Sequence, residues 1–253
     1  MRVLANLFHF IRSTQIYVVS YPKTGRTWLR TMIGKYLIEH YGLPETEMMK
    51  TDRLTLGAGL SKTKFTHDGA ALSRRIPYTE LNPSKASYRE KKVLLLTRNV
   101  KDTVVSAYFQ ATRRRGLFDG PITTFVRDEF FGVRKILTFY KQWYENREVP
   151  DDLILLKYED IHQNPARALE TSLNFIGLQD VRMDLIRSTV EYSSFENLRK
   201  LERDRIKNSG QLDDPEAYKA RQGKVGNFNQ YLDDDDIAFI DESISTWGCE
   251  FIY

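Results

Sequence analysis

The sequence has little cysteine and no long apolar run. Cys249 is the single cysteine among 253 residues, which excludes an internal disulfide and a cysteine-based metal site. A lone cysteine fits a reducing compartment, and we expect the protein to be cytoplasmic. The apolar stretch at residues 1–11 is shorter than the roughly 20 residues of a membrane span, and no small-residue cleavage site follows it. We therefore expect no transmembrane segment or targeting signal there, but a short helix or strand that covers the core.

A strong excess of either charge is also missing. Lysine and arginine together number 38, aspartate and glutamate 34, and the net charge is +4 with a pI near 9.0. Such a mild excess suits a small polyanionic ligand but does not argue for nucleic acid as a partner. The hydrophobic fraction of 41% and the charged fraction of 28% are typical of a soluble globular protein. The length suits one α/β domain or two small ones, and we predict a single domain over residues 1–253.

Short apolar runs alternate with segments of helical spacing along the chain. The apolar runs predict buried parallel strands at residues 16–20, 93–97 and 153–157, with a shorter one at 64–66. Helical spacing is found at residues 27–41, 102–114, 132–145, 165–176 and 184–192. This alternation predicts an α/β fold with a doubly wound parallel sheet flanked by helices, similar to P-loop folds. Ligands of such sheets bind at the carboxyl ends of the strands.

The segment Y-P-K-T-G-R-T-W at residues 21–28 joins the first strand to the first helix. Backbone N–H groups of a tight loop and the positive end of a helix dipole together bind anions. Lys23 adds a full charge, and Thr24 and Thr27 add hydroxyl donors. A Walker A loop requires lysine after its second glycine, whereas Lys23 precedes Gly25, so an ordinary ATPase or GTPase loop does not fit. A chance strand–turn–helix junction is the alternative interpretation.

Two further segments combine basic and polar residues. Arg98 leaves the strand at residues 93–97, and Ser106 lies two helical turns later, so both side chains can bind one phosphate. An arginine paired with a local acid is the alternative. The third segment, R-Q-G-K-V-G-N-F at residues 221–228, lies in an irregular region, residues 203–228. We expect this region to be either a disordered loop or a lid that orders on ligand.

These three segments, in this order, resemble the sulfotransferase family, whose members use 3′-phosphoadenosine 5′-phosphosulfate (PAPS). The first resembles the family's 5′-phosphosulfate loop, the second its R-N-x-K-D-x-x-x-S motif for the 3′-phosphate, and the third the R-K-G-x-x-G-[DN]-W segment that closes over that phosphate. The resemblance implies a PAPS site that also includes residues of a Y-E-D and a T-x-F motif. Its members are Lys23, Thr24, Gly25, Arg26, Thr27, Trp28, Arg98, Ser106, Tyr158, Ser193, Phe195, Arg221, Gln222 and Gly223.

Within this set, four residues correspond to adenine contacts of the family. Trp28 resembles the aromatic residue that stacks on adenine, and Tyr158 resembles the tyrosine of the Y-E-D motif. Ser193 and Phe195 are similar to the T-x-F contacts. For these aromatic side chains, packing in the core is the alternative interpretation.

The resemblance also implies a reaction: in-line transfer of a sulfuryl group from PAPS to a hydroxyl or amine, without a metal. Lys23 is implied at the leaving-group oxygen, and His67, in a T-H context after a predicted strand, is similar to the family's histidine general base. Glu45 and Glu47 are rival bases, because some branches use a glutamate some 20-odd residues after the lysine. We interpret the other histidines as structural: His9, His40 and His162.

The chain departs from the family pattern at several positions. Val100 stands in place of proline, Gln222 in place of lysine, and Phe228 in place of tryptophan. Phe65 replaces the lysine two residues before the histidine. Arg26 replaces threonine, which removes a hydroxyl donor and adds a charge whose direction, toward sulfate or toward solvent, stays open.

The acceptor and the assembly are left open by the sequence. The expected acceptor loops, residues 43–62 and 68–84, are polar and mixed, which favours a small hydroxylated molecule, a sugar or a lipid headgroup over a steroid. A dimerisation segment of the family is not recognised after residue 228, so the oligomeric state is not predicted. Two other functions are considered: a P-loop nucleotide kinase, and a non-enzymatic binder built on the same fold.

Overall fold

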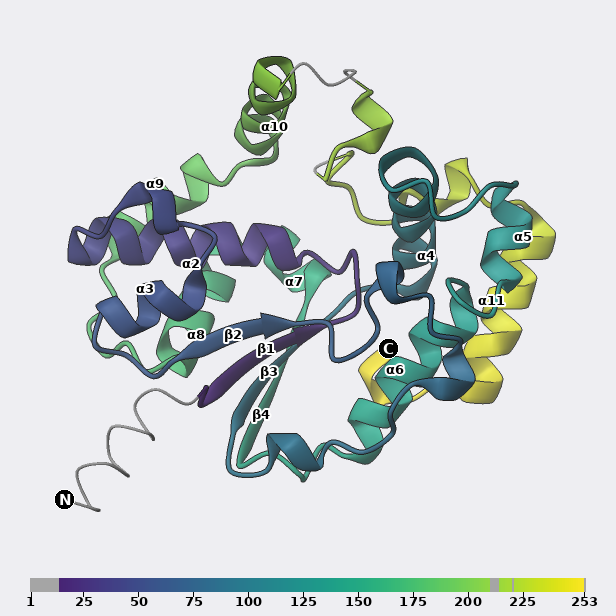
Figure 1. The fold of residues 1–253 in the computed structure, drawn as a ribbon, viewed down its shortest axis with the longest axis horizontal. Coiled ribbons are helices and arrows are strands. Elements are labelled where there is room, and N and C mark those ends of the chain that lie inside the picture. Colours follow the sequence, from purple (N-terminus) through teal and green to yellow (C-terminus); the bar gives the residue numbers. More distant parts are fainter. Residues whose placement is uncertain (1–13, 210–213, 220, 253) are drawn as a thin grey trace.

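A parallel sheet runs through the computed structural model, which describes residues 14–209, 214–219 and 221–252 (Figure 1). Its four strands are β1 (Ile16–Ser20), β2 (Thr63–Thr66), β3 (Lys92–Thr97) and β4 (Asp152–Lys157), in the order β2-β1-β3-β4. In the register, Ile16 is aligned with Thr63 on one side and with Lys92 on the other. The four predicted strands and the α/β class are confirmed. The helix or strand expected at residues 1–11 lies outside the described residues.

Helices connect and flank the strands. They are α2 (Arg26–Tyr41), α3 (Thr51–Gly57), α4 (Val100–Phe109), α5 (Ile122–Arg127), α6 (Val133–Glu145), α7 (Tyr158–Gln163), α8 (Pro165–Phe175), α9 (Met183–Tyr192), α10 (Phe195–Ser209) and α11 (Asp234–Trp247). A π-helical segment, Gln110–Arg114, continues α4. Within the described ranges, none of the helices has the length and apolar character needed to cross a bilayer.

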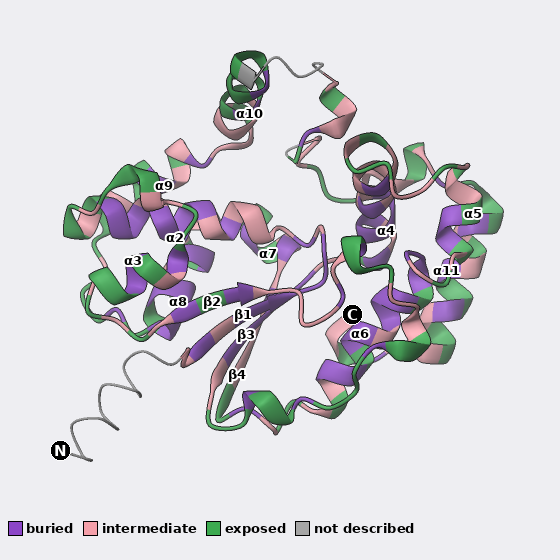
Figure 2. Ribbon diagram, viewed as in Figure 1, coloured by how far each residue is buried: buried purple, intermediate pink, exposed green. Residues whose placement is uncertain are grey.

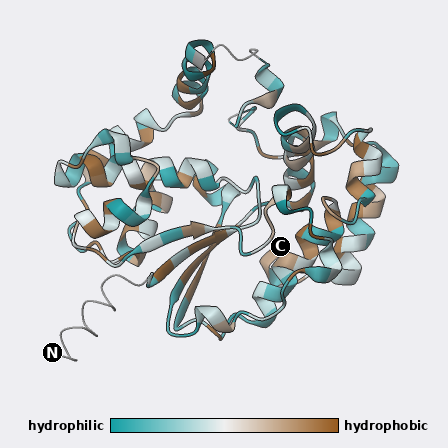
Figure 3. Cartoon of the chain, viewed as in Figure 1, coloured by the Kyte–Doolittle hydropathy of each residue, from teal (hydrophilic) through white to brown (hydrophobic). Residues whose placement is uncertain are grey.

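Alternate residues of the strands pack into two separate cores, one on each face of the sheet. Val18, Leu94 and Leu96 pack with residues of α2, α8 and α9, whereas Val19 and Leu95 pack with residues of α4, α6 and α11. Successive side chains of a strand point to opposite faces, so strands covered on both sides must be apolar throughout. Figures 2 and 3 show this arrangement: the strands and the inner faces of α2, α4 and α6 are buried and largely hydrophobic.

Backbone conformation fixes both ends of α2. The helix starts after Gly25, whose φ is 92°, and stops at Gly42, whose φ is 64° and whose N–H donates to the carbonyl of Ile38. A Cβ on Gly25 would lie 2.6 Å from the ring of Tyr158. Glycine at this position therefore permits both the left-handed turn and the close approach of the aromatic ring.

Three predicted segments differ from the structure by more than one residue. The helix predicted at residues 102–114 begins at Val100, because the side chain of Asn99 caps it by accepting from the Asp102 N–H. The segment 43–62, expected as a loop, contains α3. The region 203–228, expected to be a disordered loop or a lid, is helical up to Ser209, where α10 ends.

The order of the strands places a crevice at the carboxyl ends of β1 and β3. The chain leaves β1 through α2 and α3 to form β2 on one side, and then returns to form β3 on the other side of β1. Connections from neighbouring strands therefore go to opposite faces of the sheet, and the loops between them separate. The loop of residues 21–25 follows β1, and Arg98 follows β3, so both predicted phosphate-binding segments lie at this crevice.

Candidate functional site

A cavity with a volume of about 760 Å³ lies over these strand ends. Its walls come from the loop after β1, the first turn of α2, the end of β3, α4, α7, α10 and residues 219, 221–224, 227 and 228. Segments far apart in the sequence thus meet around one space. The predicted residues that line it are Lys23, Gly25, Arg26, Thr27, Trp28, His67, Arg98, Ser106, Tyr158, Ser193, Phe195, Arg221, Gln222 and Gly223.

Thr24 is the predicted site residue that does not line the cavity. It is fully buried, and its hydroxyl donates to the carbonyl oxygen of Tyr21 at 2.9 Å. The hydroxyl therefore closes the loop from inside, and only the backbone of Thr24 is left to contact a ligand. The loop also holds Lys23 at a φ of 73°, a left-handed conformation that non-glycine residues rarely adopt and that is enriched at functional sites.

Lys23 lies in a strongly cationic environment. Burial lowers its pKa to about 7, and the charges of Arg114, Arg98 and Arg221 act in the same direction, opposed by Glu202. Desolvation and like charges both disfavour a protonated amine. The opposite charge of a bound polyanion offsets both effects, so the environment of Lys23 favours a negatively charged ligand.

Arg98 joins the loop after β1 to the third segment. Its guanidinium donates to the carbonyl of Lys23 at 3.2 Å and to the carbonyl of Lys224 at 3.1 Å, and it lies 4.2 Å from the ring centroid of Tyr158. The alternative interpretation of Arg98, as the partner of a local acid, has little support, since the nearest oxygen of Asp102 is 3.8 Å from its guanidinium. Its Nε atom is buried and has no hydrogen-bond partner in the described parts of the chain.

The third segment is tied to the rest of the cavity by specific contacts. Arg221 lies 4.0 Å from the ring centroid of Phe109 and donates to the Tyr231 hydroxyl at 2.8 Å. Gln222 donates to the same hydroxyl. Gly223 has a φ of 62°, and a Cβ there would lie 2.3 Å from the ring of Phe195. This glycine therefore allows the segment to pack directly on one of the predicted adenine contacts.

Aromatic side chains from α2 and α7 form part of the cavity wall. The indole of Trp28 meets the ring of Tyr158 edge-on at 5.9 Å. Both also lie near His162, whose Nε2 is 2.9 Å from the carbonyl oxygen of Gly223. Ser193 is buried, and its hydroxyl has no partner among the described residues. An unused buried hydroxyl beside aromatic faces is typical of a binding site for a planar, polar ring.

His162, interpreted from the sequence as structural, is part of the cavity wall. The side chain lines the cavity, four residues after Tyr158 on the same face of α7. That i, i+4 spacing was the available signal. Further cationic residues of the cavity wall were not predicted: Arg30, Arg114, Arg115, Arg205 and Lys219.

His67 follows β2 and faces the same cavity. Its Nδ1 lies 2.8 Å from the carbonyl oxygen of Ser20, an acceptor only, so Nδ1 carries the proton and Nε2 carries the lone pair. Burial lowers the pKa of His67 to about 4, and the charges of Arg26 and Arg30 contribute. The imidazole is therefore neutral near pH 7 and held in one tautomer.

The rival bases do not reach the cavity. The side chain of Glu45 is 75% exposed and lies 3.6 Å from Lys35, while Glu47 forms ion pairs with Lys50 at 2.8 Å and with Arg53 at 3.4 Å. Both belong to the surface turn Glu45–Glu47 and are absent from the residues described around the cavity. Their arrangement is that of surface charge.

The other two histidines do not line the cavity in the described parts of the chain. His40 stacks on the ring of Tyr36, near the end of α2 and outside the cavity lining. His9 lies outside the described residues.

Comparison with known proteins gives one consistent result. Residues 13–248 match the sulfotransferase domain family. Flavonol 4′-sulfotransferase of Flaveria chlorifolia is 25% identical, over 97% of this chain and 84% of that protein, and cytosolic sulfotransferase 17 of Arabidopsis thaliana is 26% identical over 94% and 75%. A mouse sulfotransferase solved with 3′-phosphoadenosine 5′-phosphate (PAP) has a similar fold, with a TM-score of 0.65 at 19% identity over 96% of this chain and 90% of that one.

Proposed function

The chain belongs to the sulfotransferase family and is a PAPS-dependent enzyme, and from this premise we propose that it transfers the sulfuryl group to a hydroxyl or amine with His67 as the general base. One observation carries the proposal: a single cavity gathers cations from two strand ends and a neutral histidine of fixed tautomer. The position of the cavity, at a topological switch of the sheet, is where such folds bind ligands.

The donor is proposed to extend across the cavity. The backbone N–H groups of residues 24–27 and the side chain of Lys23 hold the 5′-phosphosulfate, because the first N–H groups of a helix have no intrahelical acceptor. Arg98, Ser106 and Arg221 hold the 3′-phosphate, with Gln222 and Gly223 closing over it. The adenine lies among four further side chains: Trp28, Tyr158, Ser193 and Phe195.

Lys23 is proposed to stabilise the leaving group. In the transfer, the bond between the sulfur and the 5′-phosphate oxygen breaks while the acceptor oxygen bonds to the sulfur, and negative charge develops on the phosphate oxygen. Binding of the donor raises the lowered pKa of Lys23, so the ammonium is present when that charge forms. Fixed cations at this place lower the barrier without a metal ion.

His67 is proposed to take the acceptor's proton. The hydrogen bond from Nδ1 to Ser20 leaves the Nε2 lone pair to accept it, and the resulting imidazolium loses the proton to solvent after the product leaves. A pKa of about 4 in the empty site makes His67 a weak base in the ground state. Developing negative charge between it and Lys23 raises that pKa, so proton transfer is favoured as the new bond forms.

The acceptor is proposed to be a small molecule. The relatives named above include a flavonol sulfotransferase, and a retinol dehydratase with retinol and PAP has a similar fold, with a TM-score of 0.65 at 18% identity. A glycan or lipid headgroup is a second possibility within the same chemistry. We propose a cytoplasmic location, in line with relatives that are named cytosolic sulfotransferases.

Calorimetric titration with PAP, with 5′-AMP and ATP as controls, tests the donor site. We expect PAP to bind at least ten times more tightly than either control, since only PAP has the 3′-phosphate that Arg98 and Arg221 are proposed to bind. Equal binding of ATP would instead favour a nucleotide kinase.

For the general base, His67→Ala should retain PAP affinity but lose turnover. Turnover rates like those of the wild type would remove His67 from the mechanism.

A further inference from the structure

Two arginines of α2 stand beside His67 without forming an ion pair. Arg26 and Arg30 are one helical turn apart, so their side chains share one face of the helix, and both line the cavity. No ion pair to either guanidinium occurs within residues 14–209, 214–219 and 221–252. The two guanidiniums disfavour each other's charge, and the carboxylate of Asp52 acts on Arg30 from beyond ion-pair distance. A further negative charge beside the pair would therefore be favourable.

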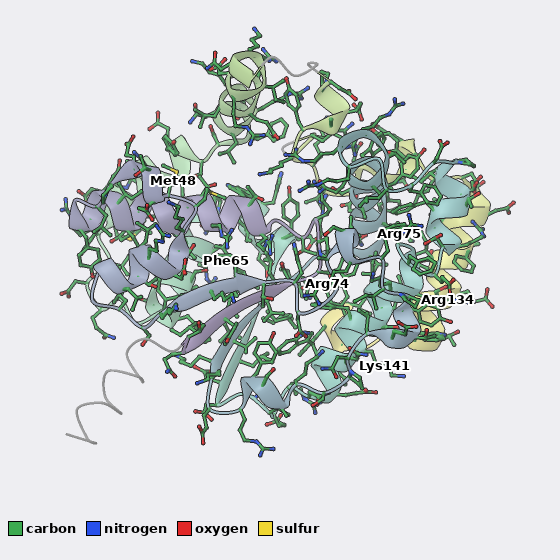
Figure 4. All side chains as sticks on the ribbon, in the orientation of Figure 1. Met48, Phe65, Arg74, Arg75, Arg134 and Lys141 are labelled. Atoms are coloured by element: carbon green, nitrogen blue, oxygen red, sulfur yellow. The ribbon has the colours of Figure 1, made fainter. Side chains whose placement is uncertain are left out.

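The surroundings of Arg30 orient it for a ligand. Its guanidinium lies 4.7 Å from the ring centroid of Phe65, which projects from β2 into the core beneath α2 (Figure 4). Stacking on an aromatic face leaves the N–H edges of a guanidinium available for an oxyanion. The Nε atom is buried and has no hydrogen-bond partner among the described residues. A buried, unsatisfied charged donor is costly unless a ligand pairs with it.

These two arginines form a cationic group distinct from the one around Lys23. The charges that lower the pKa of Lys23 include those of Arg98, Arg114 and Arg221. Those that lower the pKa of His67 come from Arg26 and Arg30. The cavity therefore has two positive ends, one at the proposed leaving-group lysine and one at the proposed base.

We propose that the acceptor carries an anionic group, a carboxylate or a phosphate, and that Arg26 and Arg30 bind this group while His67 faces the reacting hydroxyl. The inference rests on the proposed function, and it names the substrate class of the same site. Met49, Leu72 and Leu117 also line the cavity and offer an apolar surface for the acceptor's carbon skeleton. The backbone N–H of Arg26 still serves the donor, whereas its side chain serves the acceptor.

An anion held by two guanidiniums gives the acceptor a fixed orientation. Arginine binds carboxylate and phosphate through paired donors, so both the position and the rotation of the acceptor are restricted. The hydroxyl is then presented to Nε2 of His67 in one geometry, and orientation of this kind accelerates a bimolecular transfer. The anion itself takes no part in bond making or breaking.

The test compares similar acceptors with and without an anionic group. The probes are 4-hydroxyphenylacetate and 6-hydroxyhexanoate against their methyl esters, and 4-hydroxyphenyl phosphate against 4-methoxyphenol. Transfer from radiolabelled PAPS and calorimetric binding to the PAP-saturated enzyme are both measured. We expect at least one acid to exceed its neutral partner tenfold or more in kcat/KM or in affinity, and the carboxylate and phosphate arms identify which anion is preferred. Neutral partners equal to or better than the acids in every pair, including pairs in which neither binds, would overturn the proposal.

Variants then assign the preference to the arginines. Arg30→Gln should reduce the ratio of acid to neutral partner at least tenfold, Arg30→Lys should reduce it less, and Arg89→Gln should leave it unchanged. Arg89 is exposed and lies just before β3, at the end of the sheet away from the cavity, so its loss is a matched change of charge. An equal fall for both partners in Arg30→Gln would mean that the guanidinium acts on the sulfuryl group and would reject the inference. Failure of the wild type to bind PAP would instead reject the proposed function.

Discussion

Binding of PAP should be accompanied by uptake of a proton at Lys23. In the empty cavity its pKa is about 7, because burial and the charges of Arg98, Arg114 and Arg221 disfavour the ammonium. The 5′-phosphate of PAP beside Lys23, together with the 3′-phosphate on Arg98 and Arg221, returns the pKa of Lys23 toward its ordinary value near 10.4. Between these two pKa values the complex holds a proton that the free enzyme lacks.

The magnitude follows from the two pKa values. At pH 8 about one Lys23 in eleven is protonated in the free enzyme, so binding should take up about 0.9 proton per site, and at pH 6 about 0.1. Because the complex binds more protons, affinity falls as pH rises, by about tenfold per unit between roughly pH 8 and pH 10. Below pH 7 the phosphates of PAP titrate as well, so the range above pH 7.5 is the informative one.

Calorimetry in two buffers of different ionisation enthalpy measures this uptake directly. At pH 8 the apparent binding enthalpy in phosphate and in Tris should differ by about 0.9 of the difference between the buffer enthalpies. Lys23→Arg is the matched control, because a guanidinium stays protonated over this range. An uptake near zero at pH 8 in the wild type, or an uptake unchanged in Lys23→Arg, would refute the reasoning.

Three further predictions follow from contacts elsewhere. Gly25→Ala should destabilise the fold by about 2 kcal/mol more than Gly59→Ala in urea unfolding, because both glycines have positive φ but only at Gly25 would a Cβ lie within 3 Å of a neighbouring ring; equal losses would contradict this. Lys85→Met should cost about 3 kcal/mol, since Lys85 is buried and lies 2.8 Å from Asp68; a change under about 1 kcal/mol would show that the pair is not needed. In the ligand-free protein, the NMR signals of the His67 imidazole should not titrate between pH 8 and pH 6, because its pKa there is about 4; a midpoint in that range would contradict the described environment of His67.

The fold was largely predictable because its central strands, β1 and β3, are buried on both faces and the edge strand β4 also has an apolar run. Strands of this kind are continuously apolar, so β1, β3 and β4 could be located from the sequence to within one residue. The helices that pack on them carry regular spacing. By contrast, α3, α5 and α7 are only six or seven residues long, too short for a periodic signal to stand out from the loops around them.

The site was predictable where the chemistry is local and unpredictable where the fold determines it. The loop at residues 21–28 and Arg98 could be identified because phosphate binding needs a glycine turn, a helix start and cations in a fixed order. The inward hydroxyl of Thr24 could not, because it depends on how the loop closes on Tyr21. Arg114 was missed for a similar reason: the π-helical segment after α4 changes which side chains face the cavity.

The departures from the family pattern at the third segment have compensations in the structure. Gln222 lacks the charge of a lysine, but it donates to the same Tyr231 hydroxyl as Arg221. This shared contact holds the guanidinium of Arg221 in place. Phe228 lacks the indole of tryptophan, yet its ring lies 5.2 Å from the ammonium of Lys101 on α4. The backbone of the segment is fixed separately.

Side chains of α4 and of the residue after β3 hold the backbone of this segment in place. The carboxylate of Asp102 accepts the N–H of Gly226 at 2.8 Å, and Arg98 donates at once to the carbonyls of Lys23 and Lys224. Arg98 therefore connects the proposed 5′-phosphate loop to the segment proposed to close over the 3′-phosphate. Arg98→Lys keeps the charge but provides no planar fork for two carbonyls. We expect this variant to lose more than tenfold in PAP affinity while its affinity for 5′-AMP, which lacks the 3′-phosphate, falls less; equal losses for the two nucleotides would place Arg98 at the 5′-phosphate instead.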